Sequence, residues 1–349
     1  MKKLGIIVLI ILVVVGLWVV DLLMDAGQFK TIEPHFAGKC TQISGIVGPE
    51  DITIHPKTNV AYISAIDIRA ALIDENTNGS IYRYDLKESK PALIKMSHDH
   101  TGGLFPHGIS LYPDKNGAGS LFVVNHARGQ HTIEIFSLVD GRLEHQKTLS
   151  SPMIISPNDV VAVGPDRFYF TNDHNYRNGF MRTLEDYGRL KVANLVYYDG
   201  ETFSEVAADF AYPNGVNVSR DGQKLFMIAG TEQVLYVFDR NIDSGSLEEV
   251  DKVELGTVGD NIEMAANGDI WIAAHPQILK FVAHAADASK LSPSQVLRVF
   301  EKPDRKYQLE EIYLNDGKEL SGSSVAAPYG KRFLIGAVFD SKFLDCTLE

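Results

Sequence analysis

The chain has 349 residues, of which 45% are hydrophobic and 22% are charged, and its formal net charge is −12. This composition is typical of a globular protein with a large core, and it excludes a disordered chain. Because no basic run follows Lys2-Lys3 and no arginine-aromatic interleaving occurs, the sequence argues against nucleic acid as a partner.

An uninterrupted apolar run covers residues 4–20. As a helix it would reach about 25 Å, near the lower limit for crossing a bilayer. Bulky residues follow Asp21 in place of a small-residue cleavage site, which favours an uncleaved anchor over a cleaved signal peptide or a buried core helix. Positive charge before the run predicts that the rest of the chain lies on the extracytoplasmic side, periplasmic or extracellular, or is secreted if the segment is cleaved.

Short apolar runs separated by turn dipeptides follow this segment. The runs are rich in β-branched and aromatic residues, as buried strands are, and include residues 60–64, 120–124, 167–171, 224–228 and 269–273. The dipeptides that supply the positive φ of a tight hairpin are Asp140-Gly141, Asp199-Gly200, Asp221-Gly222 and Asn267-Gly268. The pattern predicts a series of antiparallel hairpins.

Six polar stations recur along the chain at intervals of 46 to 63 residues. The stations are Glu50-Asp51, His107-Gly108, Asn158-Asp159, Asn214-Gly215, Asp260-Asn261 and Ser323-Ser324. Several are followed by an apolar run, a turn with Gly or Pro, and a second apolar run, which is blade-like repetition. The sequence therefore predicts an all-β, six-bladed β-propeller over residues 25–349 behind a signal-anchor helix over residues 1–24. A β-sandwich would fit the strands but not the spacing.

Two segments depart from this repeat. Residues 66–79 (IDIRAALIDENTNG) form a long stretch after a strand, and residues 283–291 (AHAADASKL) have a helical composition. Both could be surface decoration. Long loops in compact domains are often functional, however, so residues 66–79 are also a candidate active-site flap.

The stations supply the oxygen ligands that calcium prefers, which are carboxylates, amide carbonyls, backbone and water. Five such side chains come from four stations: Glu50, Asn158, Asn214, Asp260 and Asn261. Only two of them are charged, so a bound ion would keep enough charge to polarise a carbonyl group. Taken singly, each is a common turn or cap residue. Their joint recurrence at the blade spacing is what indicates a site.

Two acidic residues beside these ligands suggest a second ion. Neighbouring side chains of an extended strand point to opposite sides, so Asp51 and Asp159 can face away from Glu50 and Asn158. Asp51 and Asp159 are therefore candidate ligands of a second, deeper calcium.

Histidines are the candidates for proton transfer. His107 occupies a station and His126 follows one strand later, so the two could face each other across a hairpin, one taking a proton from water and the other relaying it. Either could instead be a structural histidine. His174 and His275 are weaker candidates at comparable strand ends, and Asp173 is an alternative base. The motifs of serine hydrolases, P-loop proteins and zinc peptidases are absent from the sequence.

The only two cysteines, Cys40 and Cys346, lie near the two ends of the predicted propeller. They could be free core thiols. They could also form a bridge that closes a circular fold in an oxidising compartment.

These motifs resemble those of the paraoxonase (serum paraoxonase/arylesterase) family, in order and spacing, from about residue 30 to the end. The segments are Gly-Pro-Glu50-Asp51, Pro-His107-Gly-Ile109-Ser, Val-Val-Asn-His126, Asn158-Asp159-Val-Val-Ala-Val-Gly-Pro, Thr-Asn-Asp-His174, Asn214-Gly-Val-Asn, Asp260-Asn261-Ile and Gly-Ser-Ser-Val-Ala-Ala. The resemblance implies a six-bladed propeller with two central calcium ions. It also implies lactonase activity, with aryl ester and sometimes organophosphate hydrolysis.

The resemblance also implies roles for individual residues. Those matched to the ligands of the catalytic calcium are Glu50, Asn158, Asn214, Asp260 and Asn261. Those matched to the ligands of the structural calcium are Asp51, Asp159 and the backbone carbonyl of Ile109. His107 and His126 match the proposed catalytic dyad, Cys40 and Cys346 match the terminal disulfide, and the hydrophobic N-terminus matches a membrane or lipoprotein anchor.

The chain departs from the family at two places. Ile66-Asp-Ile-Arg69 stands where the flap carries an aromatic residue, and Ala274 precedes His275 where mammalian members have a free cysteine. The sequence thus predicts a calcium-dependent hydrolase of lactones and aryl esters that needs no covalent serine. The alternatives are a gluconolactonase or senescence-marker type of propeller lactonase with one divalent metal, and a non-catalytic scaffold stabilised by calcium.

Overall fold

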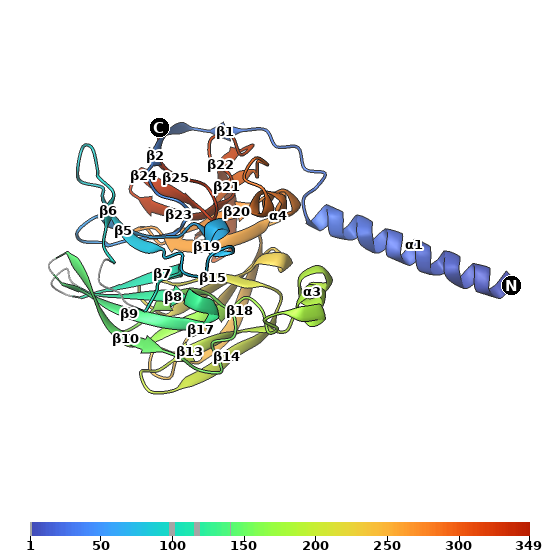
Figure 1. Cartoon of the computed structure of the whole chain (residues 1–349), viewed down its shortest axis with the longest axis horizontal. Helices are drawn as coiled ribbons and strands as arrows, with labels where there is room; N and C mark the ends of the chain where they lie inside the picture. Colours follow the sequence, from blue (N-terminus) through green and yellow to red (C-terminus); the bar gives the residue numbers. More distant parts are fainter. Residues whose placement is uncertain (1, 98–101, 115–118, 140) are drawn as a thin grey trace.

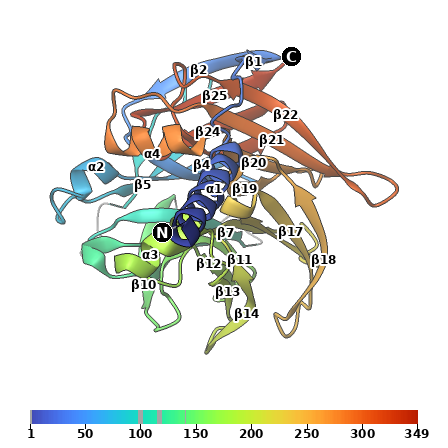
Figure 2. The ribbon, with the colours of Figure 1, turned by 90° about the vertical axis from the view of Figure 1, so that its right-hand side faces the viewer.

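A computed structural model describes residues 2–97, 102–114, 119–139 and 141–349. Six antiparallel sheets stand around one axis, as Figure 2 shows from one end, so the predicted six-bladed β-propeller is confirmed. The innermost strand of each sheet contacts the innermost strand of the next, and the sixth contacts the first. The ring is therefore closed.

The strands of each blade follow one another outward from the axis. The innermost strands are β3 (Pro49–Ile54), β7 (Pro106–Pro113), β11 (Pro157–Ala162), β15 (Pro213–Val218), β19 (Val258–Met264) and β23 (Ser323–Tyr329). The second strands are β4 (Val60–Ala65), β8 (Gly119–Asn125), β12 (Phe168–Asn172), β16 (Lys224–Ala229), β20 (Ile270–His275) and β24 (Arg332–Ala337). The third strands are β5 (Ser80–Asp85), β9 (Thr132–Val139), β13 (Ala193–Tyr198), β17 (Val234–Arg240), β21 (Ser294–Glu301) and β25 (Lys342–Leu348). The outer strands of the first five blades are β6 (Ile94–Lys95), β10 (Arg142–Leu149), β14 (Phe203–Phe210), β18 (Leu247–Glu254) and β22 (Tyr307–Asn315).

The apolar runs of the sequence form the second strands, with ends that agree to within two residues. The Asp-Gly and Asn-Gly pairs lie in turns, where Gly200, Gly222 and Gly268 have positive φ. Asp140 lies outside the described residues.

The sixth blade takes its outer strand from the other end of the propeller. β2 (Gly38–Ser44) pairs with β25, while β1 (His35–Phe36) extends the fifth blade. Cys40 lies opposite Cys346 in the β2–β25 pairing and is bonded to it, which excludes the alternative of two free thiols. The disulfide therefore fastens the ring where it closes.

Replacing both Cys40 and Cys346 by serine is expected to lower the free energy of unfolding by about 5 kcal/mol, because the bridge restricts a very long loop in the unfolded chain. Urea unfolding followed by tryptophan fluorescence measures this change. The double variant keeps the hydrogen bonds between β2 and β25, so it is still expected to fold. An unchanged unfolding midpoint would mean that strand pairing alone closes the ring.

The apolar core is divided among the six interfaces between neighbouring blades. Six buried clusters each combine side chains from two adjacent sheets. Phe122 of the second blade, for example, packs against Phe168 of the third with 5.4 Å between ring centroids. Because the apolar side chains are buried between the blades, polar side chains can line the axis.

The helical segments lie at the end of the propeller where the innermost strands begin, because they connect second strands to third strands. They are α2 (Ile68–Ala71), η1 (Ala127–Gly129), α3 (Gly179–Gly188), η2 (Gly230–Glu232) and α4 (Ile278–Ala286). We call this end the helical face. The helix expected over residues 283–291 corresponds to α4, which both begins and ends five residues earlier than predicted. Its end coincides with a turn in which the side chain of Asp287 accepts a hydrogen bond from the backbone N–H of Ser289.

The N-terminal helix α1 (Lys2–Asp25) projects from the helical face, as Figure 1 shows. Its apolar span is not buried, which excludes the alternative of a core helix, and it is long and apolar enough to cross a membrane. At its C-terminal end, Asp21 and Asp25 form ion pairs with Arg189, the residue that caps the C-terminus of α3. These ion pairs hold the base of α1 against the propeller.

Candidate active site at the propeller axis

Each innermost strand carries its station at a break in its regular pairing. The register shifts lie at Pro49/Asp51, Pro106/Ile109, Pro157/Val160, Pro213/Val216, Gly259/Ile262 and Ser323/Ala326. β-Bulges of this kind redirect side chains and are common beside functional sites. The polar residues and the irregular backbone therefore coincide in all six blades.

The side chains expected to hold a catalytic calcium are all buried at the starts of four innermost strands. They are Glu50 on β3, Asn158 on β11, Asn214 on β15, and Asp260 and Asn261 on β19, and none is more than 5% exposed. Asn261 Nδ2 donates a hydrogen bond of 2.9 Å to Oε1 of Glu50. The fold thereby brings residues of the first and fifth blades into contact.

Four of these five side chains have an oxygen with no hydrogen-bond partner among the described residues. These atoms are Glu50 Oε2, Asn158 Oδ1, Asn214 Oδ1 and Asn261 Oδ1. An unpaired buried polar atom costs about 1–3 kcal/mol, so four in one ring of strands call for a common partner. All four are acceptors, and a cation satisfies such a set.

The carboxylates at the axis disfavour one another's ionisation. Burial raises the pKa of Glu50 well above its ordinary value, and the nearby charges of Asp51 and Asp260 raise it further. Burial also raises the pKa of Asp51 to about 7 and that of Asp159 well above normal. A cation at the axis would reverse these shifts, because opposite charge favours the ionised carboxylates.

Asp51 and Asp159 differ from the preceding set because their oxygens have partners. Asp51 accepts a hydrogen bond of 2.7 Å from the backbone N–H of Ile109, and Asp159 accepts one of 2.7 Å from that of Val216. Each carboxylate thus ties its own innermost strand to that of the next blade. The carbonyl of Ile109 is the predicted ligand, whereas its contact with Asp51 in the structure is made by its N–H.

The sixth station, Ser323-Ser324, also connects blades. Ser324 Oγ donates a hydrogen bond of 2.5 Å to the backbone oxygen of Glu50, and Ser323 Oγ donates one of 3.2 Å to that of Ala274. The last blade therefore helps to fix the backbone that presents Glu50.

His107 and His126 contact each other beside the oxygen cluster. His107 Nδ1 lies 3.0 Å from His126 Nε2, and His107 Nε2 lies 3.5 Å from Oε1 of Glu50. Burial lowers the pKa of both imidazoles, and for His126 the neighbouring His107 and His131 lower it further. A lowered pKa favours the neutral imidazole, which is the form that can accept a proton.

A third histidine, His131, continues this arrangement and was missed by the sequence analysis. Its Nδ1 lies 2.6 Å from Nδ1 of His126. Asn125 and Thr132 are paired between β8 and β9, so His126 and His131 are the first and last residues of a six-residue connection. The sequence signal that could have indicated His131 is the presence of two histidines at the ends of a short connection between strands.

The other histidine candidates are bound to carboxylates. His275 Nε2 lies 2.9 Å from Oδ2 of Asp260, while His174 lies 2.7 Å from Asp173 and 2.6 Å from Asp186. Burial alone would raise the pKa of Asp173, but its hydrogen bonds to His174 and a serine outweigh burial and lower it to about 2. Asp173 is thus an engaged, weakly basic carboxylate, which argues against its role as the alternative base.

The model of the arylesterase family matches residues 29–348 of this chain. The chain belongs to the arylesterase family. Among its relatives, serum paraoxonase/arylesterase 2 of Gallus gallus is 36% identical over 321 residues, 89% of each chain. Serum paraoxonase/arylesterase 1 of Homo sapiens is 31% identical over 331 residues, 91% of each chain. The family resemblance inferred from the motifs is therefore confirmed.

Solved propeller structures resemble this arylesterase-family chain in fold. Regucalcin from Agrobacterium tumefaciens, a calcium-binding protein, has a TM-score of 0.54 at 13% identity, covering 90% of this chain and 94% of that one. A gluconolactonase from Xanthomonas campestris has a TM-score of 0.51 at 12% identity, covering 92% and 99%. At this level of identity the likeness concerns the propeller fold alone.

Two station glycines of this arylesterase-family protein are required by close packing. A Cβ on Gly108 would lie 2.5 Å from Oδ1 of Asp159, and a Cβ on Gly215 would lie 2.5 Å from the backbone oxygen of Asp260. Both distances are far shorter than van der Waals contact. The glycines therefore let neighbouring innermost strands approach and bring their polar residues together.

Residues 66–79, the candidate flap, are fastened to the helical face by Arg69. Its guanidinium donates hydrogen bonds to the backbone oxygens of Ala285 and Phe339 at 3.2 and 3.0 Å, and it lies 4.9 Å from the Phe339 ring centroid. Arg69 thus connects α2 to the end of α4. Its role as an active-site flap stays a prediction.

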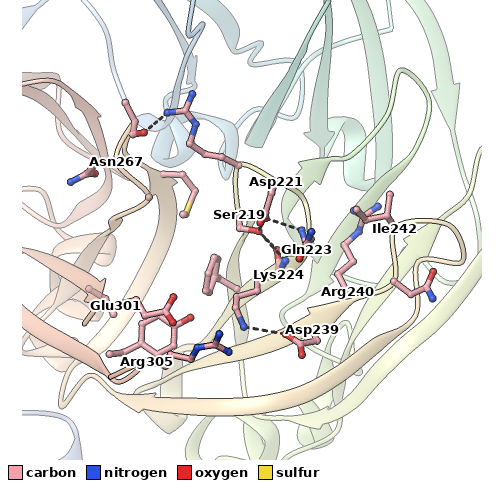
Figure 3. Close-up of a pocket in the computed structure, with 18 of the residues that line it drawn as sticks. Ser219, Asp221, Gln223, Lys224, Asp239, Arg240, Ile242, Asn267, Glu301 and Arg305 are labelled. Atoms are coloured by element: carbon pink, nitrogen blue, oxygen red, sulfur yellow. Dashed lines mark hydrogen bonds and ion pairs between the residues drawn. The ribbon is translucent and has the colours of Figure 1, made fainter. Parts of the chain in front are cut away.

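A pocket of about 910 Å³, shown in Figure 3, lies between the fourth and fifth blades at the end remote from the stations. Its lining is mostly polar turn residues, among them Lys224, whose Nζ lies 3.1 Å from Oδ1 of Asp239. No station residue lines it. The pocket is therefore separate from the polar cluster at the axis.

The pairing of His174 with two carboxylates predicts a pH-dependent stability. Burial alone would lower the pKa of His174, but hydrogen bonds with Asp173 and Asp186 outweigh it and raise the pKa to about 9. The protonated ring stabilises the fold fully below its unfolded pKa of about 6.5, and this contribution is lost as the pH rises through 9. The free energy of unfolding should fall across this window, and His174→Gln should flatten the fall. Urea unfolding at several pH values tests this, and equal slopes for both proteins would contradict it.

Proposed function

We propose that this protein is a calcium-dependent hydrolase of lactones and aryl esters, with organophosphates as secondary substrates. The support is four buried oxygens that have no hydrogen-bond partner among the described residues and lie beside two histidines in contact with each other. Membership of the arylesterase family makes the protein a carboxylic ester hydrolase.

The donor set at the axis suits calcium. Among residues 2–97, 102–114, 119–139 and 141–349, no three His, Cys, Asp or Glu side chains form a metal-binding group by themselves, so amide oxygens are needed to complete the set. Oxygen-only ligation with few charges favours Ca²⁺ over transition metals. The proposed ligands are Glu50, Asn158, Asn214, Asp260 and Asn261. When bound there, calcium would polarise the substrate carbonyl and stabilise the negative charge that develops on its oxygen.

His107 has the position of a general base beside this cluster. Its Nε2 faces Glu50, and its Nδ1 is bonded to His126. A neutral His107 can take a proton from the water that attacks the ester carbon, while His126 accepts the proton from Nδ1. When the bond between carbon and the leaving oxygen breaks, Nε2 of His107 returns a proton to that oxygen. The products, an acid and a phenol from an aryl ester or a single hydroxy acid from a lactone, are then released without a covalent enzyme intermediate.

A second calcium, bound by Asp51, Asp159 and the carbonyl of Ile109, completes the proposal. Its support is the raised pKa of two buried carboxylates, of which Asp159 is further affected by the charge of Asp51. Their hydrogen bonds to backbone N–H groups favour the rival one-metal lactonase, in which these residues only join blades. Calcium counted per chain by equilibrium dialysis distinguishes two ions from one.

The helix α1 is proposed to be an uncleaved anchor with the propeller on the extracytoplasmic side. Its length, its apolar exposed surface and a disulfide typical of oxidising compartments support this topology. The full-length protein should then stay with membranes after an alkaline wash. A shortened N-terminus in the soluble fraction would show a cleaved signal instead.

Hydrolysis of phenyl acetate and of lactones with varied acyl tails tests the proposed function. Activity should disappear after exhaustive chelation and return when calcium is added. Full activity after chelation would exclude the calcium mechanism. Inactivity towards every substrate would favour the calcium-stabilised scaffold, and a preference for polar sugar lactones would favour the gluconolactonase type.

A further inference from the structure

We propose that His131 is a positioning residue that extends the proton path from His107 and His126 to solvent. This inference rests on the proposed hydrolysis at His107. The three histidines would then form a proton relay in which only His107 contacts the reacting water.

The distances define an unbroken line of imidazole nitrogens. His107 Nδ1 lies 3.0 Å from His126 Nε2, and His126 Nδ1 lies 2.6 Å from His131 Nδ1. Both separations are within hydrogen-bonding range. Each ring meets the next edge to face, with 5.2 and 4.8 Å between centroids. The middle ring, His126, therefore uses both of its nitrogens within the line.

The backbone around the middle ring is held in place. The N–H of His126 donates a hydrogen bond of 3.0 Å to the oxygen of Phe105, and the side chain of Asn125 accepts hydrogen bonds from the N–H groups of Phe105 and Ala127. On the other side of the connection, His131 directly precedes β9. The two histidines are thus held at the end of a regular strand pair, so their contact is built into the fold.

The tautomers of three neutral rings form a consistent line of donors. With Nε2 of His107 free to accept from water, its Nδ1–H donates to Nε2 of His126. The Nδ1–H of His126 then donates to Nδ1 of His131, whose own proton is on Nε2. Each ring carries one proton, and each contact has one donor and one acceptor.

A proton can cross this line without leaving charge on any ring. Nε2 of His107 takes a proton from water, and the Nδ1 proton of His107 moves to Nε2 of His126. The Nδ1 proton of His126 moves to Nδ1 of His131, and the Nε2 proton of His131 passes to solvent. The reverse shift returns a proton through His107 to the leaving oxygen, which balances the reaction and restores the tautomers.

His131 provides the exit of this path. It is half-buried and lines a pocket of about 330 Å³ together with Gly129, Gln130, Thr132, Ser150, Ser151, Pro152 and Arg177. Burial and the charges of Arg177 and His107 lower the pKa of His131, whereas Asp173 opposes them. The ring is therefore neutral near pH 7, as the relay needs. Arg177 is itself fixed by hydrogen bonds to the backbone oxygens of Ile154 and Ile155.

The test compares His131→Phe and His131→Gln with the wild-type, calcium-loaded enzyme. We expect kcat for phenyl acetate to fall on the order of 10-fold, less than the loss of a general base itself, while KM and the calcium content stay unchanged. The loss should shrink as the buffer concentration rises. Added imidazole should restore kcat in His131→Gln, because it can occupy the pocket and accept the proton.

The control is His145→Gln, an exposed histidine in the same blade that is bonded to Glu134 and lies outside the relay. It should show neither a lower kcat nor a buffer dependence. If the His131 variants lose thermal stability but keep wild-type kcat, pH profile and buffer response, the relay is overturned and His131 only packs. If the wild-type and control proteins are themselves inactive, the proposed function has failed, and the relay with it.

Discussion

Glu50→Gln is expected to weaken calcium binding and to lower kcat/KM by at least about 100-fold. This is a larger loss than that caused by replacing a residue that contacts a metal only through one of its ligands. Glu50 is only 1% exposed, and its Oε2 has no partner among the described residues. Glutamine keeps the shape and an oxygen that can accept from Asn261. It also removes the charge and can place an amide donor where an acceptor is needed.

Calcium content, measured by equilibrium dialysis, and the hydrolysis of phenyl acetate check this expectation. The matched control is Glu134→Gln, a glutamate 2% exposed on β9 whose carboxylate accepts hydrogen bonds from the hydroxyls of Thr132 and Thr148. The control should cost stability but leave calcium content and kcat unchanged. Normal calcium content and turnover in Glu50→Gln would remove Glu50 from the site.

His107→Gln is expected to lower kcat by about 10²–10⁴-fold, which is the usual contribution of a general base. Calcium should still bind, because the oxygens proposed to hold it belong to other side chains. His107 Nε2 lies 3.5 Å from Oε1 of Glu50 and supplies no ligand of its own. The two largest effects are therefore separable. Glu50→Gln loses the metal and the activity, whereas His107→Gln loses the activity alone.

Single-turnover kinetics with calcium-loaded protein measure the His107 effect on chemistry directly. His284→Gln is a suitable control, since His284 is a buried histidine that lies on α4 and contacts the backbone oxygen of Lys290. A kcat in His107→Gln within a few-fold of this control would assign the proton transfer to another group.

The spacing of the stations was enough to predict the propeller, because each blade must return the chain to the axis once per repeat. The periodicity predicts that Glu50 and Asn261 both lie at the propeller axis. It does not predict the hydrogen bond between them, which joins residues 211 positions apart in the sequence. Such a contact depends on how six blades close, which no local pattern contains. The register shifts at the stations are equally invisible in the sequence, since they belong to the pairing of each innermost strand with the second strand of its blade.

The contact of the third histidine with His126 could not be predicted from the sequence. His131 stands outside the stations, and its meaning depends on the exact pairing of Asn125 with Thr132. A shift of one residue in that register would turn the side chain to the other face of the sheet. The end of α4 was mispredicted for a similar reason, because the turn at Asp287 and the helix compete for the same backbone groups.

The closure of the ring also sets the order of maturation. Glu50 is on the first strand of the first blade to be synthesised, but its backbone oxygen receives the hydrogen bond of Ser324, which arrives 274 positions later. Contacts of such long range form late, after the local hairpins. The polar cluster can therefore assemble only once the last blade has emerged and docked. A chain truncated or stalled before β23 would carry every predicted ligand and still lack an assembled metal centre, so calcium binding would report completed folding.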